Sequence, residues 1–202
     1  MSTLTRNTGL GRNTGLDPET QYMEIYRNLS TYEFPWDINQ SLSFALFRTY
    51  AVPSIGNLLD RTGAFTQQTQ KRYDDTAILL EVPLVEGFDS TTGKAAIRRI
   101  NQMHKMYDIS NDDMRYVLST FVVVPVRWLA RFGWRELADN ERLAMVRYYQ
   151  NLGRHMAIRD IPDTYEEFET LMDTYEDEHF AFDAGARRVA DSTMDLMASF
   201  YP

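Results

Sequence analysis

The sequence predicts an all-α protein with a single globular domain of about eight helices. Apolar residues recur three and four positions apart almost throughout the chain from Asp17 onward. The one cluster of β-branched residues, at 122–124, lies inside an apolar segment of helical length. The chain has 202 residues, of which 44% are hydrophobic and 25% charged, and this composition is typical of one globular domain.

The N-terminal segment is predicted to have no fixed fold of its own. Residues 6–10 and 12–16 both read Arg-Asn-Thr-Gly-Leu, and the surrounding sequence is rich in Gly, Thr and Asn. Two such short copies are too few for a repeat architecture. We therefore expect a flexible arm over residues 1–16 and a helical domain over residues 17–202.

The first helices are expected between Asp17 and Gly63. Asp17 followed by a proline is typical of a capped helix start. The segment 34–37, which contains a second proline, ends this helix, and either Asp37 or Asn39 caps the next one. Pro53 then begins a short helix that stops near Gly63.

Two helices follow on either side of a polar loop. The first is expected over 65–82 and ends at Pro83, because proline cannot donate the backbone hydrogen bond of a helix interior. The loop covers residues 87–93. The second helix places Ile97, Ile100 and His104 on one face.

The last helices carry clear start signals. Ser110 with Asp113 resembles a capping box and opens a long apolar helix, which Pro125 should kink. Asp139 caps the following helix. Thr164 with Glu167 is a full capping box that opens an acidic helix reaching about residue 182. The period of residues 184–200 is also helical.

Composition excludes several classes of function. The net charge of −8 disfavours nucleic acid as a partner, because phosphate requires clustered cations. The absence of cysteine excludes disulfides, iron–sulfur clusters and thiolate metal sites. The longest uncharged apolar run, 116–126, is too short for a transmembrane helix, which needs about 20 residues. No signal peptide is recognisable, and we expect a soluble, cytoplasmic protein.

Arg72 and Thr76 are the first candidate site residues. They are four positions apart and share a helical face with Phe65 and Leu79. An arginine in line with apolar residues needs an anionic partner. That partner is either a carboxylate of the protein, such as Asp75, or the carboxylate of a ligand, which the planar guanidinium suits.

His104 is the second candidate. Its place beside Ile97 and Ile100 directs the imidazole toward the core. It is either a core histidine with a satisfied hydrogen bond or the axial ligand of a haem iron.

Glu176-x-x-His179 is the third candidate. This spacing occurs twice in di-iron helix bundles, but the sequence has no second copy, which favours a surface ion pair. The segment 163–183 holds nine acids and no Lys or Arg, so it is either a solvated face or a docking surface for a basic partner.

Several short segments, in this order along the chain, are similar to the rubber-oxygenase family and more closely to its MpaB-like branch. They are Phe34-Pro35-Trp36-Asp37, Tyr50-Ala51-Val52-Pro53, Arg72-x-x-Asp75-Thr76, Ile100-Asn101-Gln102-Met103-His104-Lys105-Met106-Tyr107, Phe132-Gly133-Trp134-Arg135 and Ile158-Arg159-Asp160-Ile161-Pro162. Together they span most of residues 17–170.

The resemblance implies a helical fold that encloses a non-covalent b-type haem. His104 would be the proximal iron ligand, and Arg72 and Thr76 would line the haem pocket, with Thr76 as the candidate catalytic residue. The rubber-cleaving members carry Lys immediately before this Thr, whereas this chain has Asp75, so a lysine-capped closed state is not expected.

The resemblance further implies an oxygenase that uses O2 to cleave carbon–carbon double bonds of an apolar, isoprenoid-like substrate. Two alternatives remain open from the sequence. One is a haem carrier or sensor with the same pocket and no turnover. The other is a helical interaction module without a cofactor.

Overall fold

The computed structural model of the protein describes residues 11–200, and all regular secondary structure in that part is helical, which confirms the all-α prediction. The elements are α1 (Tyr22–Asn28), the π-helix η1 (Leu29–Glu33), α2 (Pro35–Thr49), α3 (Pro53–Thr62), α4 (Ala64–Gln67), α5 (Thr69–Glu86), α6 (Thr91–His104), α7 (Asn111–Phe132), α8 (Asp139–His155), α9 (Tyr165–His179) and α10 (Ala184–Ser199). The predicted number of helices was slightly low, because the structure separates the four-residue α4 from α5 at Gln68.

Helix boundaries were predicted correctly where a side chain caps the start of its own helix or a glycine ends it. The Ser110 hydroxyl accepts the Asp113 N–H at 2.9 Å. The Thr164 hydroxyl accepts the Glu167 N–H at 3.2 Å, and the Glu167 carboxylate accepts the Thr164 N–H at 3.3 Å. Gly63 ends α3 with a φ of 70°, a conformation that glycine adopts without a steric penalty.

The prediction that Pro83 ends its helix was wrong. Pro83 is buried inside α5, which continues to Glu86. Arg27 donates from Nε to the Leu84 carbonyl at 3.1 Å, so packing against α1 holds the segment beyond the proline. Gly87, with a φ of 89°, ends the helix instead.

Three other predicted helix starts are shifted by a few residues. Asp17 closes a turn by accepting the Glu19 N–H at 3.1 Å, and α1 begins only at Tyr22. The second helix, α2, begins at Pro35, before both of the caps expected for it. Asp139 is the first residue of α8 rather than its cap.

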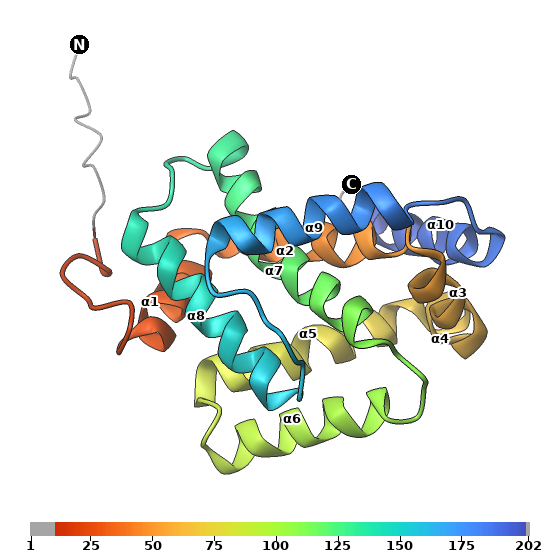
Figure 1. The fold of residues 1–202 in the computed structure, drawn as a ribbon, viewed down its shortest axis with the longest axis horizontal. Helices are drawn as coiled ribbons and strands as arrows, with labels where there is room; N and C mark the ends of the chain where they lie inside the picture. Colours follow the sequence, from red (N-terminus) through yellow and green to blue (C-terminus); the bar gives the residue numbers. More distant parts are fainter. Residues whose placement is uncertain (1–10, 201–202) are drawn as a thin grey trace.

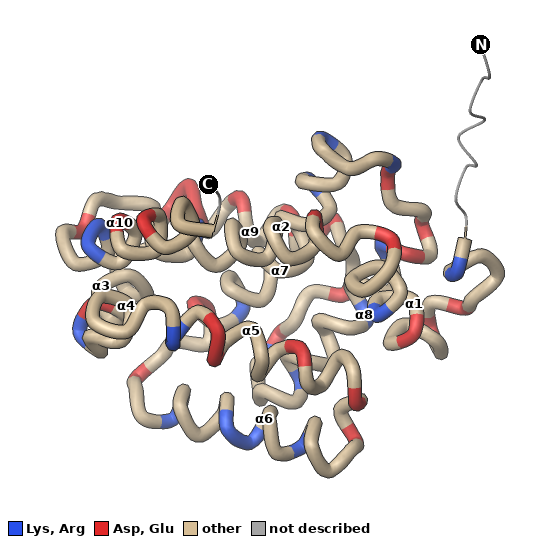
Figure 2. Tube along the Cα trace, turned by 180° about the vertical axis from the view of Figure 1, so that it is seen from behind, with Lys and Arg blue, Asp and Glu red and all other residues tan. Residues whose placement is uncertain are grey.

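The helices pack in antiparallel and crossed pairs around α7 (Figure 1). Helices α2 and α9 both lie against α7, while α1 packs on α8 and α3 on α10. Helices α5 and α6 pack on each other along one side of the molecule. The view from behind shows that α6 carries Lys and Arg but no acidic residue (Figure 2).

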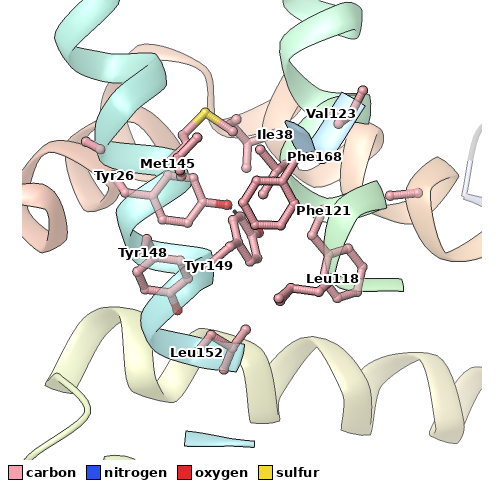
Figure 3. Packing of buried hydrophobic residues seen from close by; sticks show 14 of the residues in the cluster. Tyr26, Ile38, Leu118, Phe121, Val123, Met145, Tyr148, Tyr149, Leu152 and Phe168 are labelled. Atoms are coloured by element: carbon pink, nitrogen blue, oxygen red, sulfur yellow. Dashed lines mark hydrogen bonds between the residues drawn. The ribbon is translucent and has the colours of Figure 1, made fainter. Parts of the chain in front are cut away.

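The core lies between α1, α7, α8 and α9 and is rich in aromatic rings (Figure 3). Tyr26 and Tyr149 are buried, and their hydroxyls share a hydrogen bond of 2.7 Å. Phe168 of α9 and Phe121 of α7 complete the cluster. Each of these two buried hydroxyl groups therefore has a hydrogen-bond partner within the core.

The second half of the predicted N-terminal arm contacts the helical domain. Asn13 is buried, and its amide donates to the Glu141 carboxylate at 2.9 Å. The amides of Asn28 and Asn140 donate to the side-chain and backbone oxygens of Asn13. Residues 1–10, with the first repeat copy, lie outside the described part of the chain.

Between residues 11 and 200, no helix has both the length and the apolar character that a membrane span requires. The longest, α7, is interrupted by charged residues such as Arg115 and Arg127.

Removal of the Thr164 cap tests how much this side chain stabilises the start of α9. We expect Thr164→Ala to lower the free energy of unfolding by about 1 kcal/mol, because the Glu167 N–H loses its acceptor. Chemical denaturation measures this loss. In the matched variant Thr170→Ala, within the same helix, alanine should leave stability unchanged or slightly higher. An equal loss in both variants would show that the cap is not its cause.

Candidate functional site

The candidate site lies on α5 and α6, the pair of helices along one side of the fold (Figure 1). Helix α5 is unusual for an eighteen-residue helix, because Pro83 is its only buried residue. Ile78 is 58% exposed and Val85 is 46% exposed. The helix therefore presents apolar surface that the described residues do not cover.

Arg72 and Thr76 interact directly on α5, as their spacing predicted. The Arg72 guanidinium donates from Nη1 to Thr76 Oγ1 at 2.6 Å, and the same hydroxyl donates to the Arg72 carbonyl at 2.8 Å. The guanidinium carbon also lies 5.3 Å from the centre of the Phe65 ring. The hydroxyl thus fixes the guanidinium in one position.

The carboxylate partner suggested for Arg72 within the protein is not found. Asp75 forms its ion pair with Lys71, one turn away on α5. Among residues 11–200, Arg72 makes no ion pair or hydrogen bond with a carboxylate. Burial lowers the pKa of Arg72, which nearby Tyr50 and Asp75 partly counteract. The half-buried cation is left available for an external anion.

His104 is the last residue of α6, on the face where Ile97 and Ile100 are buried. Its Nδ1 atom is buried and has no hydrogen-bond partner among residues 11–200. A satisfied core histidine, the alternative suggested by the sequence, is therefore not what the structure contains. Burial lowers the pKa of His104, and the positive charge of Arg72 lowers it further. The imidazole is thus neutral at pH 7.

The effect of Arg72 on the His104 pKa places the two side chains of α5 and α6 within electrostatic reach of each other. A neutral imidazole with a free buried nitrogen and a cation without a carboxylate are the groups that iron and the propionates of a haem require. The donor groups therefore fit a b-type haem.

Two pockets border these helices, with volumes of about 410 and 720 Å³. The smaller lies between α6 and the end of α8, and the larger runs along the first turns of α5. Neither is lined by Arg72, Thr76 or His104. The candidate site residues therefore do not belong to either of these two pockets.

Sequence reasoning did not identify Tyr50 and Tyr107 as neighbours of Arg72, although both affect its pKa. Tyr50 follows α2 and is buried, which raises its pKa to about 12. Its ring lies 5.8 Å from that of Phe65, the ring under the guanidinium. Tyr50 stands in one of the segments singled out above, but only the tertiary contact of its ring with Phe65 of α4 brings it to Arg72.

The Glu176-x-x-His179 step is structural, and the expected surface ion pair was wrong. Glu176 is buried, where its carboxylate pairs with Arg48 and accepts the Tyr116 hydroxyl at 3.1 Å. His179 stacks on the Tyr175 ring with centroids 4.0 Å apart. Over residues 11–200, no group of three His, Asp or Glu side chains could hold a metal ion.

Residues 41–201 match the catalytic domain described as ER-bound oxygenase mpaB/B'/rubber oxygenase. The ER-bound oxygenase mpaB of Penicillium roqueforti (strain FM164) is 32% identical over 197 residues, covering 89% of this chain and 66% of the relative.

Two proteins of Penicillium brevicompactum are also similar to this chain. Its ER-bound oxygenase mpaB is 31% identical over 193 residues, which cover 87% of this chain and 49% of the relative. Its ER-bound oxygenase mpaB' is 35% identical over 140 residues, 66% of this chain and 33% of the relative. The chain thus spans from one third to two thirds of the length of these relatives.

The family match covers α3 to α10 and includes Arg72, Thr76 and His104. The resemblance inferred from short segments is confirmed over most of the chain. This chain belongs to the family of the ER-bound oxygenases mpaB and mpaB' and the rubber oxygenases.

Proposed function

We propose that this chain is a b-type haem-dependent oxygenase that uses O2 to cleave carbon–carbon double bonds of an apolar, isoprenoid-like substrate. The observation that carries the proposal is the placement of Arg72, Thr76 and His104 on the packed helices α5 and α6, with the His104 Nδ1 buried and unpartnered. Membership of an oxygenase family supports the activity, and the haem is inferred from the donor groups.

Each of the three residues has a separate role. His104 would hold the iron, because a neutral imidazole is an iron ligand and a protonated one is not. Arg72 would hold a propionate through its planar guanidinium. Thr76 fixes that guanidinium and is the candidate catalytic hydroxyl. When bound and held by His104 and Arg72, a haem would supply the oxidising chemistry with O2, while the protein would set access and orientation of the substrate.

The apolar substrate is supported by the surface of α5. Ile78 and Val85 expose about half of their side chains on the helix that carries Arg72 and Thr76. Exposed apolar surface of this kind is typical of a place where an apolar ligand or partner binds. The relatives are named as bound to the endoplasmic reticulum, and the cytoplasmic location of this chain stays a prediction.

The test is spectroscopic and then chemical. The purified chain is mixed with haem, and its visible spectrum is recorded. The complex is then incubated with O2 and a polyprenyl substrate. Carbonyl products support the proposed oxygenase. A bound haem without products supports a carrier or sensor, and a chain that binds no haem would be a helical module without this cofactor.

Arg72→Ala tests the anchor of the propionate. We expect haem to dissociate about tenfold more readily, because a charge-assisted hydrogen bond is lost from a half-buried position. Transfer of haem to apomyoglobin measures this retention. The matched variant is Lys71→Ala, which removes the neighbouring, exposed cation that pairs with Asp75. Unchanged retention in Arg72→Ala would exclude this residue from the site.

A further inference from the structure

A second concave site lies on a different face of α6. This pocket, of about 410 Å³, is bordered by α6, by the loop before it and by the end of α8. Its size falls in the range of pockets that bind small molecules, roughly 300–1,000 Å³. It is independent of the proposed haem site, whose residues do not line it.

The pocket face follows from the helical period of α6. Lys94, Arg98, Asn101 and Lys105 are spaced four, three and four positions apart, so they align on one side of the helix. His104 stands one position before Lys105 and is rotated from it by about 100° around the axis. The cations and His104 therefore lie on different sides of α6, and Ile97, which shares a face with His104, stands at the edge of the pocket.

The walls combine apolar and cationic groups. Phe88 and Ile97 are buried and form the apolar side. The Phe88 ring stacks on the His155 ring with centroids 4.9 Å apart, and Asn101 donates to the His155 carbonyl at 2.9 Å. These contacts tie the loop, α6 and the end of α8 together, so that the walls are held by tertiary packing.

The charge of the pocket is positive in a chain of net charge −8. Arg98 and Lys105 form no ion pair with any residue between 11 and 200, whereas Lys94 lies 3.6 Å from the Asp89 carboxylate. Three cations against this one acid leave about two positive charges, which matches the charge of a phosphate monoester at pH 7. Helix α6 itself has no acidic residue to offset them (Figure 2).

We propose that this pocket binds a small molecule that carries a phosphate monoester on an apolar or aromatic body. The phosphate lies against Lys94, Arg98 and Lys105, because the guanidinium and ammonium groups donate charge-assisted hydrogen bonds to its oxygens. The apolar body lies against Phe88 and Ile97. A solvated basic helix without the apolar walls would lack this second requirement.

The test is calorimetric titration of the full chain with phenyl phosphate, with phenol and inorganic phosphate as partial probes. We expect saturable binding of phenyl phosphate at about 1 mM or tighter, with weaker binding of each partial probe. Arg98→Ala should weaken phenyl phosphate binding about tenfold.

The matched control is Arg99→Ala, which removes the same charge from the adjacent position of α6, outside the pocket. The affinity of Arg99→Ala for phenyl phosphate should equal that of the unaltered chain. His104→Ala should also keep phenyl phosphate binding, which separates this site from the haem proposal.

Four outcomes would overturn the proposal. The first is the absence of saturable phenyl phosphate binding, and the second is an equal loss of affinity in Arg99→Ala and Arg98→Ala. The third is binding of inorganic phosphate as tightly as phenyl phosphate. The fourth is that the chain sediments with phosphatidic acid vesicles in a manner that depends on Arg98 but does not bind phenyl phosphate. The last result would assign the cations to a lipid surface.

Discussion

The His104→Ala variant is expected to lose, or to shift strongly, the Soret band that the unaltered chain develops with haem. In the described part of the chain, His104 supplies the one imidazole between α5 and α6. After its removal, the remaining side chain of α6 with a soft donor that can ligate haem iron is that of a methionine. Without this ligand, haem that stays in the pocket would change its coordination, and the rest would be released.

The other two histidines provide matched controls. His179 stacks on Tyr175 at the end of α9, and His155 stacks on Phe88 at the end of α8. Replacing either with alanine should leave the spectrum unchanged. Added free imidazole should restore the band in His104→Ala, because the ring would refill the space left by the side chain. An unaltered spectrum in His104→Ala would remove this residue as the iron ligand.

The second large effect is expected from Arg135→Met, far from the candidate site. Arg135 donates to the Glu141 carboxylate at 2.7 Å and to that of Glu33 at 3.2 Å. The Glu141 side chain is only 3% exposed and also accepts the amide of Asn13. Removing the cation leaves buried carboxylates without a counter-charge, and we expect the free energy of unfolding to fall by about 3–5 kcal/mol.

The loss in Arg135→Met should depend on pH. Burial raises the pKa of Glu141, but the hydrogen bonds from Arg135, the Ala138 N–H and Asn13 lower it more, so the net shift is downward. In the unaltered chain this carboxylate therefore stabilises the fold above its ordinary pKa, and the contribution is lost as the pH falls through the lowered value. In Arg135→Met, the effect of burial on the pKa of Glu141 dominates, so we expect this carboxylate to take up a proton at a higher pH than in the unaltered chain. The difference in free energy of unfolding between the unaltered chain and Arg135→Met should therefore become smaller from pH 7 to about pH 5.

Chemical denaturation at both pH values checks this expectation. Arg142→Met is the matched control, because among residues 11–200 the one ion pair of Arg142 is with the exposed Asp139 on the same helix. Its effect should stay within about 0.5 kcal/mol. A similar loss in both variants, or a gap for Arg135→Met that is constant with pH, would contradict a buried ion pair as the cause.

The sequence was informative wherever a property depends on neighbours in the chain. The helical period, the caps at Ser110 and Thr164 and the stop at Gly63 all rest on interactions within about four residues. The contact between Arg72 and Thr76 is of the same kind. Family membership was also recognisable, because the matching segments are short and keep their order.

Some features could not be predicted because they depend on partners far away in the chain. Pro83 stays helical in α5 while Arg27 of α1 holds the next residue, and Glu176 of α9 is buried because Arg48 of α2 and Tyr116 of α7 meet it. Asn13 is anchored by Glu141, more than a hundred residues away. No local pattern contains such pairings.

The sequence by itself thus determined the helical class, the helix ends that carry local caps or glycine stops, the family and the three candidate residues. Only the tertiary structure decided that Arg72 has no carboxylate partner among the described residues and that the buried nitrogen of His104 has no hydrogen bond. The physical reason is that burial and charge pairing are sums over all neighbours in space, and helix packing, rather than chain order, selects those neighbours.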